Sequence, residues 1–435
     1  MADSSTARPS PVGGYQRRIL DDEMDELTSA LSAIALEGPK AVGKTATAVQ
    51  RAQTIYKLDE PERRAVAEAD LDRLLDAPPP VLFDEWQYVP AVWDRVRRAD
   101  DGGAAPGQFL LTGSASPGDT GTHSGGGRIV SVRMRPLSLA ERWPGETTVS
   151  LAELLRGERK PVTGSTERGL EDYAAEVLHS GFPGLRRLRD RALRAQLDTY
   201  LRRVVDRDFP ELGHNVRNAD GLRRWMSAYA AATATTASFE RIRDAASGGN
   251  DRPPAKTTIA PYREVLERLF ILDEVPGWLP TRNPIKRLAL PPKHHLADPA
   301  LAATLLGATA SGLLEGDSPG PAVPRDGTLL GALFESLVTQ SIKVYAQAAE
   351  AAVAHLRLRA GTHEVDLIVD RGDGHVVAIE IKLSATVRDD AVKHLNWLQQ
   401  EIGDDLLDRV IITTGPEAYR RSDGVAVVPA ALLGP

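Results

Sequence analysis

The chain has 435 residues, a formal net charge of -7 and no cysteine. A chain of this length is too long for one hydrophobic core, so we expect two or three domains. The lack of cysteine excludes disulfides, zinc–thiolate sites and thiol nucleophiles, and the net charge gives no general attraction to nucleic acid or anionic membranes. Neither an apolar N-terminal segment nor a membrane-length apolar run is present. We therefore expect a soluble cytoplasmic protein without a membrane span.

The first part of the chain alternates short apolar strands with helical segments. An amphipathic helix at about 16–31 precedes an apolar strand at 33–36, and another helix begins near Lys44. Residues 59–77 are helical in pattern, and further apolar strands follow at 81–85, at 108–114 and after Arg128. This alternation is typical of a parallel α/β sheet, so the sequence predicts such a domain over 15–145.

The loop between the first strand and its helix matches the phosphate-binding pattern G-x-x-x-x-G-K-[ST]. It consists of Gly38, Pro39, Lys40, Ala41, Val42, Gly43, Lys44 and Thr45. The glycines let backbone N–H groups turn towards phosphate oxygens. Lys44 brings a cation to the β- and γ-phosphates, and the Thr45 hydroxyl ligates Mg²⁺. A chance match is the alternative, but the flanking strand and helix are the context that a phosphate site requires, so we expect the loop to bind ATP.

Two later strands end in polar residues that suit the same chemistry. Asp84 is placed to hold Mg²⁺ through water, and Glu85 is the natural general base for the attacking water. Acidic residues at strand ends are common, so Asp84 and Glu85 indicate a nucleotide site only because a phosphate-binding loop precedes them. Thr112 ends the next strand where a γ-phosphate sensor would lie, or is simply a polar strand end leading into a loop. Arg128 would place charge on the γ-phosphate of the same or a neighbouring subunit, unless it is an ordinary surface arginine.

The region 146–327 is mostly helical in pattern and ends in a Gly/Pro-rich linker. Within it, residues 222–277 give a helical stretch, a loop with Lys256, a helix at 259–269 and a strand-like segment at 270–275. That order resembles a winged helix, which would place its second helix in a DNA major groove. Winged helices also dock proteins, and this helix offers only two basic residues, Arg263 and Arg268, beside Glu264 and Glu267. An arginine-rich run at 186–203 is interleaved with aspartates, as in a solvated helix face.

Residues 328–435 are expected to form a small α/β domain. Asp366 lies on one predicted strand, and the two-residue period places Glu380 and Lys382 on one face of the next. Glu335 lies on the preceding helix. This is the layout of PD-(D/E)XK nucleases, in which carboxylates hold Mg²⁺ and the lysine orients the attacking water. The alternative is an alternating strand whose charged residues face solvent.

Taken together, these motifs resemble prokaryotic P-loop ATPases of the AAA superfamily fused to a conserved domain of unknown function. The resemblance runs from Tyr15 onward and is carried by the phosphate loop, Leu58–Pro61, Phe83–Gln87, Thr112–Ser114, Gly127-Arg128, Arg135–Leu139, His179–Pro183, Tyr200-Leu201, Arg207-Asp208, Lys286-Arg287, Phe334-Glu335, Glu364–Asp366 and Glu380–Lys382. Trp86 departs from the family's usual aliphatic residue, and the loop at 115–127 is unusually rich in glycine. The resemblance implies an α/β multidomain chain with an N-terminal ATPase, a winged-helix segment and a C-terminal nuclease-like fold.

Three classes of function fit these patterns. The first is a Mg²⁺-dependent ATPase acting on DNA, with the C-terminal domain cutting or clamping it. The second is an ATP-dependent regulator that docks proteins through an inactive nuclease-like domain. The third only binds nucleotide, and Glu85 argues against it because a binding site has no need of a base. A homo-oligomer is compatible with a role for Arg128 in a neighbouring subunit.

Overall fold

The computed structural model describes residues 14–114, 127–214, 216, 218–247, 256–281, 290–314, 328–358 and 361–435. The chain divides after Met134 into two compact units, unit 1 (Met1–Met134) and unit 2 (Arg135–Pro435). The division falls before the expected boundary at 145, and the expected middle and C-terminal domains belong to one unit. Within the described ranges, no helix combines the length and apolar character needed to cross a membrane.

Unit 1 is built on a five-stranded sheet in the order β2-β3-β4-β1-β5, and all of its strands are parallel. The strands are β1 (Ala33–Glu37), β2 (Thr54–Lys57), β3 (Val81–Asp84), β4 (Phe109–Gly113) and β5 (Val130–Arg133). The expected N-terminal parallel α/β sheet is therefore confirmed. Because β4 lies between β1 and β3, the carboxyl ends of these three strands are neighbours at one edge.

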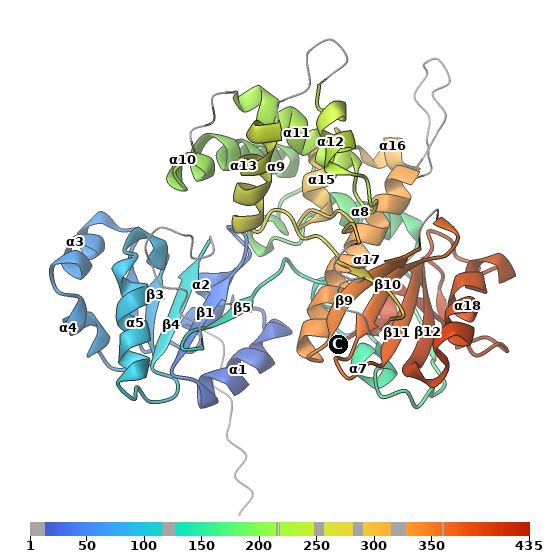
Figure 1. Ribbon diagram of the computed structural model, residues 1–435, viewed down its shortest axis with the longest axis horizontal. Coiled ribbons are helices and arrows are strands. Elements are labelled where there is room, and N and C mark those ends of the chain that lie inside the picture. Colours follow the sequence, from blue (N-terminus) through green and yellow to red (C-terminus); the bar gives the residue numbers. More distant parts are fainter. Residues whose placement is uncertain are drawn as a thin grey trace, which may run out of the picture. The chain divides into compact units, whose positions relative to one another are not determined.

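Helices cover both faces of this sheet, which is why β1, β3 and β4 are buried along their whole length. The helices are α1 (Leu20–Ala30), α2 (Lys44–Val49), α3 (Pro61–Ala69), α4 (Leu71–Leu75) and α5 (Ala91–Asp101) (Figure 1). Buried side chains of α3, α4 and α5 share one core with β1, β3 and β4. The helix expected at 59–77 is interrupted at Asp70, whose side chain accepts from the N–H of Arg73 and caps α4.

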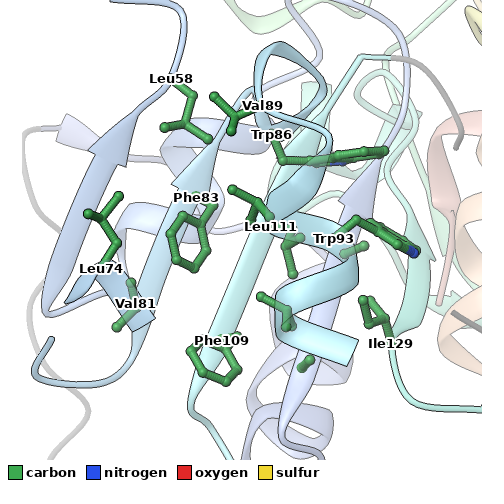
Figure 2. Close-up of a cluster of buried hydrophobic side chains, with 14 of the residues drawn as sticks. Leu58, Leu74, Val81, Phe83, Trp86, Val89, Trp93, Phe109, Leu111 and Ile129 are labelled. Atoms are coloured by element: carbon green, nitrogen blue, oxygen red, sulfur yellow. The ribbon is translucent and has the colours of Figure 1, made fainter. Parts of the chain in front are cut away.

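Aromatic residues fill the core between the sheet and α5, as Figure 2 shows. Trp86 is 3% exposed, and its ring centroid lies 4.7 Å from that of Trp93. The indole rests against Gly113, where a Cβ atom would lie only 2.6 Å from the Trp86 Nε1. A glycine at the end of β4 thus makes room for the tryptophan that departs from the family pattern.

The first half of unit 2 is mostly helical, as expected. Its longer helices are α8 (Leu170–Leu178), α9 (Asp190–Arg203), α11 (Ala219–Ala231), α12 (Phe239–Ala245), α13 (Lys256–Arg268) and α15 (Pro299–Leu305). After α11, α12 and α13, the expected strand at 270–275 is reduced to two isolated antiparallel bridges, Leu272 to Leu296 and Val275 to Lys293. The helices follow the order of the predicted winged helix, which stays a prediction.

The second half of unit 2 contains an eight-stranded sheet in the order β7-β13-β14-β12-β11-β10-β9-β8. Its strands are β7 (Gly164–Ser165), β8 (Gly277–Trp278), β9 (Ala352–Arg357), β10 (Glu364–Asp370), β11 (Val376–Ile381), β12 (Leu406–Thr413), β13 (Glu417–Arg420) and β14 (Ala426–Pro429). The helices α17 (Thr328–Ala348) and α18 (Lys393–Ile402) pack on it (Figure 1). The edge strands β7 and β8 come from the region expected as a separate middle domain, which explains why unit 2 does not divide.

A buried polar network holds the helical half of unit 2 together. The carboxylate of Asp298, which is fully buried, accepts from the N–H of Gly181 at 2.6 Å and from the Ser180 hydroxyl at 3.2 Å. The N–H of Leu137 donates to the Gly181 carbonyl at 2.8 Å, and the Arg142 guanidinium donates to the Leu137 carbonyl at 2.7 Å. Two segments of the family resemblance, at 135–139 and 179–183, therefore meet in this network.

Gly181 is the most constrained residue of this network. A Cβ atom there would lie 2.5 Å from Arg142 Nη2 and 2.9 Å from the Leu137 carbonyl oxygen. We expect Gly181→Ala to lower the free energy of unfolding by about 1–3 kcal/mol, the usual effect of overpacking a buried site. Gly184→Ala is the matched control, because a Cβ there meets nothing within 4 Å, and it should change stability by less than about 0.5 kcal/mol. Urea unfolding would contradict this explanation if both variants behaved alike.

Candidate functional site

The phosphate loop leaves the carboxyl end of β1 and leads into α2. Gly38, Ala41 and Gly43 have φ angles of 153°, 66° and 110°, and Gly43 is the N-cap of α2. A Cβ atom at Gly38 would lie 2.3 Å from the Met134 carbonyl oxygen, so only glycine fits there. This backbone turns the loop into an anion-binding concavity at the start of a helix.

Lys44 is the buried cation of this loop, with 5% of its surface exposed. Its Nζ donates to the carbonyl oxygens of Gly38 at 2.8 Å and Pro39 at 3.0 Å. Burial lowers the pKa of Lys44 to about 8, against the opposing effect of the Glu85 and Asp84 carboxylates. The side chain is thus held inside the loop at the position from which it can meet a phosphate.

This lowered pKa predicts a pH-dependent affinity. Phosphate binds the ammonium form, which predominates below the pKa of about 8 and is lost above it. The affinity for a non-hydrolysable ATP analogue should therefore fall by roughly tenfold between about pH 7 and pH 9. Lys44→Arg keeps its charge throughout this range, so its affinity, although weaker, should not change with pH. Calorimetric titration checks both, and a flat profile for the parent protein would contradict the prediction.

One carboxylate oxygen of Asp84 accepts hydrogen bonds from two threonines. The Thr45 hydroxyl donates to Asp84 Oδ1 at 2.7 Å, and the Thr112 hydroxyl donates to the same oxygen at 2.5 Å. Thr45 is the second residue of α2, Asp84 ends β3, and Thr112 lies near the end of β4. The structure therefore brings together the residues that the sequence assigned to the metal and to phosphate sensing.

Glu85 follows β3 in a left-handed backbone conformation, with φ of 55° and ψ of 50°. Its carboxylate accepts from the Ser114 hydroxyl at 3.2 Å and from the side-chain amide of Gln87. Its N–H donates to the Thr112 hydroxyl at 3.3 Å. Gln87 received no role from the sequence, and the Ser114 hydroxyl was considered only with Thr112 as part of a candidate γ-phosphate sensor; both residues lie in the motifs that carry the family resemblance. They fix the orientation of the carboxylate beside Asp84.

Arg128 does not join this group in its own chain. The register of β1 and β5 pairs Ile34 with Val130, so Arg128 lies at the amino edge of the parallel sheet. Its Nε donates at 2.9 Å to Asp101, the last residue of α5. The phosphate loop begins at the opposite edge, on the order of 15 Å away along β1. Arg128 therefore pairs with Asp101 in this structure, away from the phosphate loop, and its role on the γ-phosphate of the same or a neighbouring subunit stays a prediction.

A short N-terminal segment braces the loop from outside, which the sequence patterns did not indicate. The Arg18 guanidinium donates to the Val42 carbonyl at 3.2 Å. The Tyr15 hydroxyl donates to Asp21 at 2.7 Å and lies 2.8 Å from the Thr47 hydroxyl on α2. The Arg51 guanidinium, also 2.8 Å from Asp21, completes the brace. Most of these contacts join residues more than 20 positions apart in the sequence, so no local sequence pattern predicts them.

A second polar cluster lies in unit 2, where β10 and β11 run antiparallel. Leu367 pairs with Ile379, which places Asp366 opposite Glu380 on the neighbouring strand. Asp366 Oδ2 accepts from the N–H of Ile381 at 2.9 Å, and Lys382 Nζ donates to Glu380 at 2.8 Å. The structure thus brings the predicted strand residues together.

Glu335 reaches this cluster through a residue that the sequence did not single out. Lys293 Nζ donates to Glu335 at 2.7 Å and to Asp366 at 3.2 Å. Burial, followed by the charge of Asp366, raises the pKa of both Glu335 and Glu380. Burial would raise the pKa of Asp366 too, but the Lys293 ammonium lowers it. We call Glu335, Asp366, Glu380, Lys293 and Lys382 the carboxylate–lysine cluster.

The predicted DNA-reading helix, α13, presents less free charge than its sequence suggests. The Arg263 guanidinium donates to Glu267 at 2.5 Å and to Glu274 at 3.5 Å, and it lies 4.1 Å above the Phe239 ring. Lys286-Arg287 lie outside the described residues, as does the side chain of Lys256. In the arginine-rich run, Arg186 pairs with Glu176 at 2.7 Å and Arg202 with Asp198 at 2.7 Å. DNA binding by these elements stays a prediction.

Comparisons with known proteins match three successive parts of the chain. The family described as "AAA domain" matches residues 31–143, and two domains of unknown function, DUF8612 and DUF4143, match residues 170–312 and 330–433. Two uncharacterized proteins, Mb2031c of Mycobacterium bovis and Rv2008c of Mycobacterium tuberculosis, are each 26% identical over 414 residues, covering 91% of this chain and 80% of the relative. The N-terminal part is thus similar to an AAA domain, which supports a P-loop ATPase, and two domains of unknown function match the parts that follow.

Among solved structures, the Walker-type ATPase PABY2304 of Pyrococcus abyssi is similar at 16% sequence identity. The match covers 66% of this chain and 94% of that protein, with a TM-score of 0.39.

Proposed function

We propose that unit 1 binds ATP with Mg²⁺ and hydrolyses its terminal phosphoanhydride. The observation that carries this proposal is the meeting of Thr45 and Thr112 on one oxygen of Asp84, beside the buried Lys44 and next to Glu85. The start of α2 and the carboxyl ends of β3 and β4 supply these groups, at the edge where parallel sheets bind their ligands. The match to the AAA domain family supports the same assignment.

The phosphate loop and Lys44 hold the nucleotide in this proposal. Backbone N–H groups of the loop and the N-terminus of α2 bind the β- and γ-phosphate oxygens. The Lys44 ammonium exchanges the Gly38 and Pro39 carbonyls, which it contacts at 2.8 and 3.0 Å, for the β- and γ-phosphates. The brace formed by Tyr15, Arg18 and Asp21 keeps the loop and α2 in register while this happens.

The oxygens around Asp84 fit Mg²⁺, which prefers hard oxygen ligands. Thr45 would hold the ion directly and Asp84 through water, and both oxygens already lie within 2.7 Å of each other. When bound, the ion neutralises charge that develops on the phosphates. The hydrogen bond between Thr45 and Asp84 keeps both side chains at the position where they are needed.

Glu85 acts on the water that attacks the γ-phosphorus. As the new P–O bond forms, the bond to the β-γ bridging oxygen breaks, ADP leaves, and Glu85 accepts the proton of the water. The Ser114 hydroxyl and the Gln87 amide orient the carboxylate for this step. In this proposal Thr112, whose hydroxyl bonds both Asp84 and the N–H of Glu85, senses the γ-phosphate.

Phosphate release by the full chain tests the proposal directly. We expect ATP turnover with Mg²⁺ and none with EDTA, with ADP and phosphate formed in equal amounts. A chain that binds no ATP in calorimetry, or binds it without any Mg²⁺-dependent turnover, would contradict the proposal.

The coupling of this ATPase to unit 2 is a separate prediction with two forms. If DNA is the partner, single- or double-stranded DNA should change the rate of ATP turnover and bind with an affinity that falls with salt. If unit 2 docks a protein instead, DNA should leave turnover unchanged at every salt concentration. The internal pairing of Arg263 with Glu267 and Glu274 favours the docking form for α13.

A further inference from the structure

Lys293 is the central residue of the carboxylate–lysine cluster in unit 2. Only 1% of its side chain is exposed, and its ammonium lies 2.7 Å from Glu335, 3.2 Å from Asp366 and 3.8 Å from Glu364. Three carboxylates from α17 and β10 thus converge on one cation, and the chain itself supplies that cation.

The backbone fixes this ammonium in place. The N–H of Lys293 donates to the Val275 carbonyl at 2.8 Å, and the N–H of Val275 donates to the Lys293 carbonyl at 2.9 Å. On the next residue, His294 Nε2 lies 2.7 Å from the Ala237 carbonyl oxygen. Lys293 therefore stands on a paired, buried segment, whereas Lys382 has 40% of its side chain exposed.

The same carboxylates are the ones that a nuclease-like centre would need for Mg²⁺. A divalent ion takes several oxygen ligands that converge on one point, and here that point is occupied by an ammonium. Asp366 and Glu335 each accept from the Lys293 ammonium, and the second oxygen of Asp366 accepts from the N–H of Ile381. Glu380 accepts from Lys382 through Oε2, and its Oε1 is buried with no hydrogen-bond partner among the described residues. A divalent ion at this point would lie beside a buried like charge. Consistently, within the described ranges no three His, Asp or Glu side chains are arranged to hold a metal.

We propose that the carboxylate–lysine cluster is closed to divalent metals because the Lys293 ammonium occupies the place of the ion. The residues of unit 2 therefore do not fit the Mg²⁺ that the nuclease-like layout implies. The cluster instead joins two regions, since Lys293 lies in the match to one domain of unknown function and Glu335 and Asp366 in the match to the other. Unit 2 serves as a scaffold whose polar centre is a structural ion-pair cluster.

Removing the ammonium should convert the cluster into a metal site. We would titrate the nucleotide-free full chain with Mn²⁺ and follow binding by calorimetry and by electron paramagnetic resonance. Lys293→Met should gain one Mn²⁺ per chain with an affinity at least tenfold above any binding by the parent protein. The gain should disappear in the double variant Lys293→Met/Asp366→Asn, which assigns the ion to the cluster and separates it from the phosphate loop.

Two matched variants control for the loss of a lysine. Lys382→Met removes the half-exposed ammonium of the cluster and leaves Lys293 in place, so it should gain no Mn²⁺. Lys343→Met removes another buried lysine of unit 2, which pairs with Asp273 at 2.9 Å, and it should gain none either. If Lys293→Met does not fold, Lys293→Gln retains hydrogen-bond donors for the carboxylates without the charge, and the same gain is expected.

Several outcomes would overturn the proposal. One is stoichiometric Mn²⁺ binding by the parent protein that Asp366→Asn abolishes, since the carboxylates would then accept a metal with Lys293 present. Another is a folded Lys293→Met or Lys293→Gln that gains no Mn²⁺. A third is Mg²⁺- or Mn²⁺-dependent DNA cleavage by the parent that vanishes in Asp366→Ala, Glu380→Ala and Lys382→Ala. None of these results would affect the ATPase assignment, which rests on unit 1.

Discussion

Glu85→Gln should retain ATP and lose most of its turnover, with hydrolysis falling by on the order of 10²–10⁴-fold, the usual contribution of a general base. Glutamine keeps the size of the side chain and an oxygen that can accept from Ser114, but it cannot take a proton from water. The contacts of Asp84 with Thr45 and Thr112 are untouched, so the affinity for ATP should change by less than about twofold. Single-turnover phosphate release and equilibrium binding measure the two effects separately.

Glu62→Gln is the matched control for this variant. Glu62 lies in the first turn of α3 and is exposed to solvent, so the same chemical change there should leave turnover unchanged. Turnover at the parent rate in Glu85→Gln would show that the base lies elsewhere and that Glu85 only shapes the turn after β3.

Lys44→Ala should weaken ATP binding by at least about 30-fold, because truncating one partner of a buried charge pair costs about 2–5 kcal/mol. Only 5% of Lys44 is exposed, and its ammonium donates to the carbonyl oxygens of Gly38 and Pro39 within the phosphate loop. With weak binding, turnover should be lost as well. Calorimetric titration with an ATP analogue gives the affinity, and circular dichroism confirms that the variant is folded.

Lys57→Ala serves as its control. Lys57 ends β2 at the same edge of the sheet, but it is more than half exposed and pairs with Glu60 only at 3.9 Å. Its removal should change the affinity by less than about twofold, because exposed ion pairs contribute little. An unchanged ATP affinity in a folded Lys44→Ala would refute the assignment of the phosphate loop.

The central strands of both sheets could be predicted because they are buried and nearly continuous in apolar residues. The segments expected at 33–36 and 81–85 correspond to β1 and β3, and the predicted strand that carries Asp366 corresponds to β10. β2 was missed, since Thr54–Lys57 is a short edge strand whose residues alternate between exposed and half-buried positions. Short strands such as β7 and β8 could not be predicted, because two-residue strands depend on partners far away in the sequence.

The phosphate loop could be predicted for a different reason: its function requires contiguous residues with special backbone angles. Asp84, Glu85 and Thr112 followed because they end strands next to the loop. No sequence pattern singled out Lys293 as part of a site, since its partners Glu335 and Asp366 lie 42 and 73 residues further along the chain. Long-range ion pairs of this kind leave no local sequence pattern. In the proposal above, such a pair determines whether the nuclease-like carboxylates can bind a metal ion.

The backbone at Glu85 has a consequence for how this protein would respond to selection. A residue with a side chain in the left-handed conformation costs roughly 1–2 kcal/mol relative to the right-handed one, a penalty that glycine does not carry. With φ of 55°, Glu85 holds its carboxylate at a position where glycine would be the more stable residue. If Glu85 is the general base proposed above, selection for heat resistance alone would favour loss of this carboxylate at the expense of turnover. A library screened without an activity assay would drift towards chains that bind nucleotide and no longer cleave it.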